Sequence, residues 1–264
     1  MEKLFVSRYK KSVITIFNKL LETHGIPDLV MIHSSLWAGV ALGEILNNNE
    51  IPFIITEHLK EFLLPNGFST FQKDMIHNTY SMASQILLSS TTLKNAISKN
   101  FTTHKSKLNL LPNPVDENLF TLRNIPDNKS HFTIVCISLF RAEKRIDLVL
   151  ESFHKLLHSG IKVKLKLIGD GHLKQEIEKQ IQKLGISDLV DLPGYLPQSR
   201  IVEELHNSHL LVLASDIETF GMVLIEALAC GLPVVATDCG GPKDIITPES
   251  GILVKPGSVS ELTE

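Results

Sequence analysis

Short runs of aliphatic and β-branched residues alternate along this chain with longer amphipathic runs, which leaves few folds open to it. Strands and helices that alternate in this way form parallel sheets covered by crossover helices. The expected strands are 28–32, 52–56, 86–89, 107–111, 132–138, 161–168, 189–192, 209–214, 232–236 and 252–254. The expected helices are 5–23, 36–48, 68–83, 90–99, 145–159, 172–184, 199–207, 222–230 and 241–246. The chain is therefore predicted to be an α/β protein.

A segment rich in Pro, Asn and Asp, PNPVDENLFTLRNIPDNKS (112–130), lies between the two halves of this pattern. Such composition is typical of a connection between domains. We predict a domain over 1–115, a linker over 116–130 and a second domain over 131–264. With 264 residues, of which 43% are apolar, the chain is long enough for one large domain or two modest ones.

Charge and cysteine content argue against several classes of protein. A formal net charge of -3 without a long basic run gives no sign of nucleic-acid binding. Three scattered cysteines favour reduced thiols in the cytoplasm. The long apolar stretch 29–46 is interrupted by His33 and Glu44, so we expect no membrane-spanning helix there.

The stretch ETFGMVLIEALACGLPVVATDCGGP (218–242) carries the clearest functional pattern. Gly221 lets the backbone approach a ligand before a helix begins at Met222, and the unpaired N–H groups of a first helical turn bind anions. Glu226 lies one turn beyond Met222 on the same face, where an acid beside a bound diphosphate would accept hydrogen bonds from ribose hydroxyls.

The spacing of Glu218 and Glu226 resembles the E-x7-E signature of retaining glycosyltransferases of family 4, which have the GT-B fold of two Rossmann-like domains. The resemblance continues through KRIDLVLESFHKLL (144–157), LIGDGHLKQEIEKQIQKLG (167–185), LPGYLP (192–197) and GILVKP (251–256). Looser matches in the first half are 27–39, 51–58, 86–97 and 111–120. The resemblance implies a GT-B-like fold, with the first domain incomplete at its N-terminus and the second lacking its final helices.

The resemblance also implies a donor site in the second domain. The family has an Arg and a Lys five residues apart after the first strand of this domain; Lys144 matches the Lys, and Leu139 stands at the Arg position. Arg141 is the alternative cation, although both cations would also suit a solvated helix start. Glu218 is expected at the sugar and Glu226 at the ribose. The remaining donor-binding candidates, through backbone groups, are Thr219, Phe220, Gly221, Met222 and, at the base, Gly194.

Three residues of the first domain are candidates for the acceptor side or the reacting centre. His58 follows the expected strand 52–56, at the end of PFIITEH, and the resemblance implies that it contacts the sugar or the reacting centre. His33 ends the strand before it, and Glu57 precedes His58. A purely structural role as a core or loop residue remains the alternative for each histidine.

The implied activity is retaining transfer of a sugar from a nucleoside diphosphate to a glycan or lipid-linked acceptor, as in polysaccharide or lipopolysaccharide synthesis. Neither a cofactor nor a metal is expected, since the chain has no Asp-x-Asp motif. The basic and apolar helix 5–23 is compatible with contact at the inner face of a membrane or with core packing. The alternatives are an inactive fragment that binds a nucleotide sugar or a partner, a nucleotide-sugar epimerase, and a glycogen-synthase-like enzyme.

Overall fold

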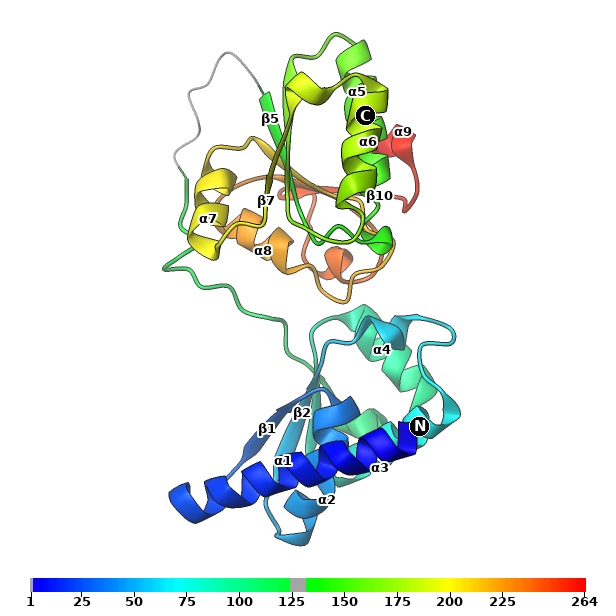
Figure 1. Cartoon of the computed structure of the whole chain (residues 1–264), viewed down its shortest axis with the longest axis vertical. Coiled ribbons are helices and arrows are strands. Elements are labelled where there is room, and N and C mark those ends of the chain that lie inside the picture. The colour runs from blue at the N-terminus through cyan, green and yellow to red at the C-terminus, as the bar shows by residue number, and fades with distance from the viewer. Residues whose placement is uncertain (1, 124–131) are drawn as a thin grey trace. The chain divides into compact units, whose positions relative to one another are not determined.

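The computed structural model describes residues 2–123 and 132–264, and they form an α/β protein with parallel sheets (Figure 1). The chain divides into two compact units, residues 1–112 and 113–264. The hydrophobic clusters of the described residues each lie within one unit. Each unit therefore has its own hydrophobic core.

Unit 1 contains a four-stranded parallel sheet in the order β1-β2-β3-β4. Its strands are β1 (Val30–His33), β2 (Phe53–Glu57), β3 (Gln85–Leu88) and β4 (Leu108–Leu110). Its α-helices are α1 (Glu2–His24), α2 (Val40–Asn48), α3 (Thr70–Met82) and α4 (Thr91–Asn100). The side chains of Ser69 and Ser90 cap α3 and α4 by accepting hydrogen bonds from first-turn amides, which fixes where these helices begin.

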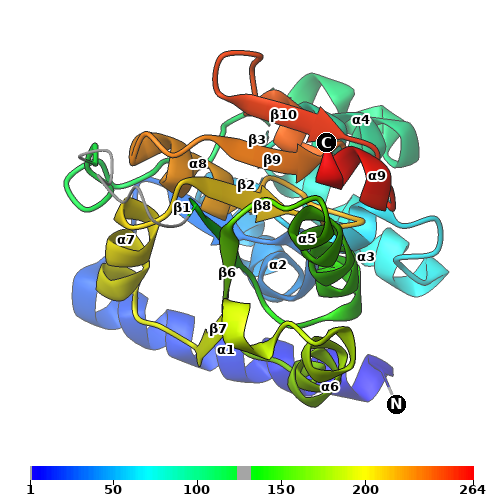
Figure 2. The ribbon, with the colours of Figure 1, turned by 90° about the horizontal axis from the view of Figure 1, so that it is seen from above.

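Unit 2 contains a six-stranded parallel sheet in the order β10-β9-β8-β5-β6-β7 (Figure 2). Its strands are β5 (Phe132–Ile137), β6 (Val163–Ile168), β7 (Val190–Gly194), β8 (Leu210–Leu213), β9 (Val234–Thr237) and β10 (Gly251–Val254). Its α-helices are α5 (Ile146–His158), α6 (Lys174–Leu184), α7 (Gln198–His206), α8 (Met222–Ala229) and α9 (Val259–Thr263).

The strand order of unit 2 is that of a doubly wound Rossmann sheet, because the chain winds outward from β5 first to one edge and then from β8 to the other. One core packs strand side chains against α5 and α6, and another packs them against α7 and α8. The winding direction reverses between β5 and β8, so the loops that follow these two strands lie at a topological switch point. Such a switch point is where open α/β sheets bind ligands.

The bounds predicted for two helices were wrong. The helix expected over 36–48 begins only at Val40, because Ser34 (φ 75°) and Trp37 (φ 33°) turn the chain between β1 and α2. The helix expected over 241–246 is only a 3₁₀ turn, Gly241–Asp244. The short helix α9 was missed, since five residues give too little periodicity to recognise.

The predicted linker lies partly outside the described residues, which end at Arg123 and resume at Phe132. Its described part packs on unit 2: Phe120 is buried, and the Arg123 amide donates to the carbonyl of Cys230 at 3.1 Å. The domain boundaries drawn from sequence stay predictions. Among the described residues, no helix is both long and apolar enough to cross a membrane.

Candidate functional site

The loops that follow β5 and β8 meet at the switch point of unit 2. The amide of Asp216 donates to the carbonyl of Glu143 at 2.8 Å, which joins the two loops. The ammonium of Lys144 forms an ion pair with Oε1 of Glu218, and Ser215 Oγ donates to the same oxygen at 3.3 Å. Both charged side chains are largely buried, with 20% of Lys144 and 14% of Glu218 exposed. The structure thus brings together two residues that the sequence pattern singled out separately.

The loop after β9 also contacts Glu218, through its backbone. Gly241 donates its amide to the carbonyl of Glu218 at 2.8 Å. A Cβ at Gly241 would lie 2.3 Å from Cα of Phe220, so only glycine allows the two backbones to approach this closely. Phe220 itself is buried, with 5% of its surface exposed. Residues 218–220 are therefore held by backbone contacts.

Helix α8 begins directly after this loop, and Gly221 at its N-cap has φ 104°. Glu226 lies one turn after Met222 and lines a cavity of about 360 Å³. Burial raises the pKa of the Glu226 carboxyl. The other residues that line this cavity are Pro114, Val115, Asp116, Phe120, Gln198 and Met222. A carboxylate therefore faces a cavity beside a helix N-terminus.

The loops after β6 and β7 complete this edge of the sheet. Gly169 donates its amide to the carbonyl of Gly194 at 3.0 Å, and a Cβ at Gly169 would lie 1.8 Å from the carbonyl oxygen of Ser138. Gly194 is buried with φ 81°, and Tyr195 after it is 77% exposed. The loop after β6 is thus in close backbone contact with both the end of β7 and the loop after β5.

Arg141 and Leu139 lie at the outer side of the loop after β5. Arg141 is exposed and precedes the 3₁₀ turn Ala142–Lys144, and Leu139 is 50% exposed. The ion pair with Glu218 is made by Lys144. Arg141 remains a candidate for a second cation.

In unit 1, His33 and His58 lie together at the carboxyl ends of β1 and β2. Their rings stack with centroids 6.0 Å apart and planes at 28°, and Nδ1 of His33 is hydrogen bonded to Oγ1 of Thr56 at 2.7 Å. Desolvation by the surrounding groups, followed by the neighbouring His33, lowers the pKa of His58. A neutral imidazole is therefore favoured at His58.

Glu57 is fully buried, unlike the two histidines beside it. Its Oε1 accepts hydrogen bonds from the Ser35 amide at 2.9 Å and from the Tyr80 hydroxyl at 3.0 Å. Burial raises the pKa of Glu57 to about 7. The structure therefore places this acid in the interior of unit 1, holding the turn that starts at Ser35.

Several polar residues of the site were not recognised from the sequence. Arg145 pairs with Asp147 and Asp216, and Gln198 lines the cavity beside Glu226. The charged cluster KRID (144–147) was the available signal for Arg145, but its partner Asp216 lies 71 residues further along the chain. Among the described residues, no group of three or more His, Cys, Asp or Glu side chains could hold a metal ion.

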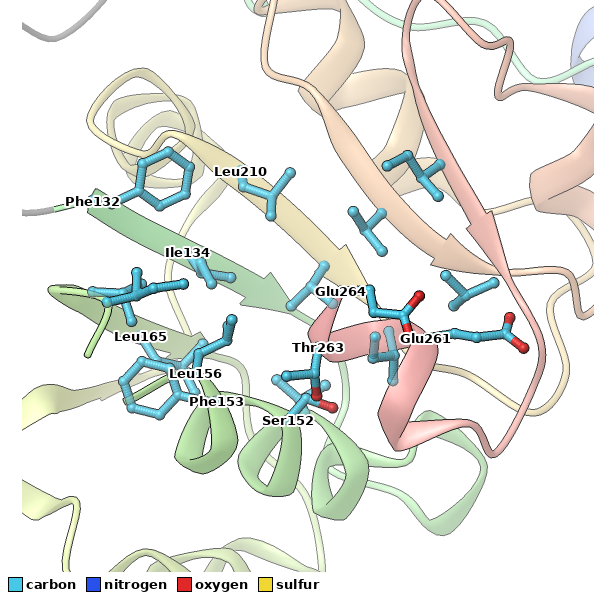
Figure 3. Close-up of a pocket in the computed structure, with 18 of the residues that line it drawn as sticks. Phe132, Ile134, Ser152, Phe153, Leu156, Leu165, Leu210, Glu261, Thr263 and Glu264 are labelled. Atoms are coloured by element: carbon cyan, nitrogen blue, oxygen red, sulfur yellow. The ribbon is translucent and has the colours of Figure 1, made fainter. Parts of the chain in front are cut away.

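A larger cavity, of about 730 Å³, lies on one face of the sheet of unit 2 beside α5 and α9 (Figure 3). Its lining is mainly aliphatic and aromatic and includes Phe132, Ile134, Phe153 and Leu210, with Glu261 and Glu264 at one side. None of the candidate site residues named from the sequence lines it. We therefore take the polar switch point, and not this apolar cavity, as the functional site.

A doubly wound sheet with polar loops at its switch point, together with a second parallel α/β unit, defines a protein of the GT-B fold. The chain belongs to a family within that class. The model of the family described as glycosyl transferases group 1 matches residues 120–264, and the chain is a member of it.

Curated relatives agree with this assignment. N-acetyl-α-D-glucosaminyl L-malate synthase of Bacillus anthracis is 32% identical over 160 residues, which cover 58% of this chain and 41% of the relative. An uncharacterized glycosyltransferase of Methanocaldococcus jannaschii is 28% identical over 279 residues, covering 96% of this chain and 68% of the relative. The chain thus spans less than half the length of the first relative.

Solved structures share the fold. HepE of Anabaena in complex with UDP superposes with a TM-score of 0.81 at 22% identity, covering 95% of this chain and 70% of HepE. Sucrose-phosphate synthase of Thermosynechococcus elongatus superposes with a TM-score of 0.77 at 19% identity, covering 94% of this chain and 65% of the synthase.

Proposed function

We propose that this protein is a retaining glycosyltransferase of family 4 that moves a sugar from a nucleoside diphosphate to a glycan or lipid-linked acceptor. The observation that carries the proposal is the switch point of unit 2. There, Glu218 and Glu226 stand in E-x7-E spacing around the start of α8, and Lys144 lies against Glu218. Unit 2 would bind the donor, and unit 1 would bind the acceptor.

The donor's diphosphate would lie at the N-terminus of α8, near Lys144. The first-turn amides of the helix supply donors for an anion, and Lys144 supplies the positive charge. Backbone groups of Thr219, Phe220 and Gly221 would contact the phosphate and sugar. HepE, which shares the fold, was solved in complex with UDP, and this supports a nucleotide as the ligand.

The nucleoside would extend into the cavity beside Glu226. Because Glu226 faces this cavity, its carboxylate can accept hydrogen bonds from the ribose hydroxyls. Glu218 would accept from sugar hydroxyls. Gly194 would contact the base through its backbone, and Arg141 would add charge at the diphosphate.

The chemistry we propose is attack on the same face from which the diphosphate leaves. The bond between the anomeric carbon and the phosphate oxygen breaks, the acceptor oxygen bonds to that carbon, and its proton passes to the leaving phosphate. Lys144 stabilises the charge on the phosphate as the bond breaks. In this proposal the step uses neither a metal nor a cofactor, and the enzyme would keep water from the reacting carbon.

On the acceptor side, we propose that His58 contacts the reacting sugar and that His33 supports it from beside the His58 ring. A neutral His58 can donate one hydrogen bond and accept another. Glu57 would act from the interior, by holding the turn at Ser35. The name of one related structure, the lipopolysaccharide outer core galactosyltransferase WaaB, is consistent with a role in surface polysaccharide synthesis.

We further propose a cytoplasmic location with contact at the inner face of the membrane through α1. This helix exposes large apolar side chains among basic ones, a combination that binds anionic membrane surfaces. Leu4, Phe5, Ile16 and Leu20 are 58%, 54%, 63% and 49% exposed. Co-sedimentation with phosphatidylglycerol vesicles should fall on Ile16→Glu, whereas retention of binding would contradict the contact.

The second candidate is a module that binds a nucleotide sugar without transferring it. The length of chain matched in the curated relatives keeps this alternative open. Nothing in the comparisons supports the epimerase alternative.

A transfer assay distinguishes the two candidates. The protein is incubated with UDP-glucose, UDP-N-acetylglucosamine or GDP-mannose and a glycan mixture, and release of nucleoside diphosphate is followed. Transfer that Lys144→Ala abolishes, with an α-linked product from an α-linked donor by NMR, supports the enzyme. Binding of a donor without turnover supports the binding module, and an inverted product contradicts the retaining mechanism.

A further inference from the structure

Arg145 adopts a backbone conformation that residues other than glycine rarely adopt. Its φ of 50° and ψ of 45° lie in the left-handed region, between the 3₁₀ turn Ala142–Lys144 and the first residue of α5. This conformation is costly for an L-residue and persists only where other interactions compensate for it. A glycine would satisfy the backbone here, so the arginine side chain itself needs an explanation.

The guanidinium of Arg145 bridges two carboxylates from different elements. Its Nε and Nη2 donate to the two oxygens of Asp147, at 3.0 and 2.9 Å, and its Nη1 donates to Oδ1 of Asp216 at 3.2 Å. Asp147 lies in the first turn of α5, whereas Asp216 lies in the loop after β8. The planar guanidinium suits such a double contact, and lysine cannot reproduce it.

This bridge joins the same two loops that carry Lys144 and Glu218. Arg145 follows Lys144 directly, and Asp216 precedes Glu218 by two residues. A backbone hydrogen bond also joins the two loops: the amide of Asp216 donates to the carbonyl of Glu143 at 2.8 Å. Contacts between the residues next to Lys144 and those close to Glu218 therefore fix how these two side chains lie relative to each other.

We propose that Arg145 is a positioning residue, which bridges Asp147 and Asp216 and thereby holds the loops after β5 and β8 so that Lys144 meets Glu218 and the donor. The proposal rests on the function proposed above for Lys144 and Glu218. It predicts that removing the side chain, while keeping the backbone conformation, impairs the site without impairing the fold.

Arg145→Gly is the appropriate variant, because glycine accepts φ 50° and removes only the bridge. Glu50→Gly is the matched control, since Glu50 is exposed in unit 1 with φ 56° and the substitution relieves the same kind of backbone strain. Hydrogen exchange of the segment 215–222 is measured for each variant without ligand. Affinity for UDP, GDP and ADP is measured by calorimetry.

We expect Arg145→Gly to exchange faster over 215–222 with an unchanged or higher melting temperature, and to bind the preferred nucleotide about tenfold more weakly. Glu50→Gly should match the wild type in both measurements. Arg145→Lys should not restore the affinity. In a Glu218→Gln background, Arg145→Gly should cause little further loss, because both act through one contact.

Unchanged exchange over 215–222 in Arg145→Gly would overturn the proposal. The proposal would also be overturned if Arg145→Gly weakened nucleotide binding as much in the Glu218→Gln background as it does in the wild type. Failure of the wild-type protein to bind any of the three nucleotides would contradict the proposed donor site instead. In that case, hydrogen exchange over residues 215–222 still tests whether Arg145 holds the two loops together.

Discussion

At the scale of single residues, the ion pair of Lys144 and Glu218 joins two loops that are far apart in the sequence. From the sequence, each residue could be placed at the end of a strand, because the apolar runs mark where the strands stop. Their direct contact could not be predicted, since it depends on the strand order and on the path of both loops. The same holds for Glu57, whose complete burial follows from how α3 places Tyr80.

The ion pair leads to a prediction about stability. Lys144→Met leaves the carboxylate of Glu218 largely buried without its cation, and should lower the free energy of unfolding of unit 2 by about 1–3 kcal/mol. Adding Glu218→Gln should recover part of this loss, because the unpaired charge is removed. Urea denaturation of the two single variants and the double variant measures the coupling. Simple additivity would show that the two side chains do not stabilise each other.

Glu57 leads to a prediction about pH. Its pKa is raised from 4.5 to about 7 by burial, so the folded protein holds a proton that the unfolded chain releases. The stabilisation is complete below pH 4.5 and is lost as the pH rises through about 7. Relative to Glu57→Gln, the wild type should therefore lose about 3 kcal/mol of stability over this range. Denaturation of both proteins between pH 4 and 8 tests this, and a constant difference would contradict it.

At the scale of elements, short apolar runs predicted the strands of both sheets closely, because strands buried on both faces leave a strong pattern. The errors fall where the backbone departs from regular geometry. Residues 36–39 look helical by composition, yet Trp37 at φ 33° breaks the helix. Hydrophobic pattern does not encode such a turn, which depends on contacts such as that of Ser35 with Glu57.

The loops after β8 and β9 approach each other closely at Gly241 and Phe220. Gly241→Ala places a Cβ about 2.3 Å from Phe220 Cα and must push the backbone of residues 218–220 away. We expect a loss of about 1–3 kcal/mol in the stability of unit 2, as for other overpacked sites, together with weaker nucleotide binding. Thermal unfolding and calorimetry measure the two effects.

Gly43→Ala in α2 is the control for this substitution. Its nearest neighbour would be the flexible end of Met82 at 3.1 Å, so the same change should be tolerated there. Equal stability of the Gly241→Ala variant and the wild type would show that the two loops do not need this contact.

At the scale of the whole molecule, the chain has separate hydrophobic cores in its two units. Composition and length allowed one large domain or two modest ones, and the strand pattern predicted two sets of strands. The position of the boundary is harder to read, because Phe120, inside the expected linker, is buried in a core of unit 2. A single aromatic residue in a polar segment gives no periodic signal.

Separate cores predict that core substitutions act on one unit at a time. Leu88 in β3 and Leu167 in β6 are both fully buried. Replacement of either by alanine should cost about 2–5 kcal/mol in its own unit. Hydrogen exchange should show faster opening only in residues 2–112 for Leu88→Ala, and only in residues 132–264 for Leu167→Ala. Equal acceleration in both units by either substitution would contradict this separation.

We propose that the switch point of unit 2 binds a nucleoside diphosphate through Glu226. Calorimetric titration with UDP, GDP and ADP tests this on the wild type, on Glu226→Gln and on Glu178→Gln, an exposed control. We expect one nucleotide to bind the wild type and the control equally, and to bind Glu226→Gln about 10- to 100-fold more weakly. Absence of binding by the folded wild type, or equal binding by Glu226→Gln, would contradict it.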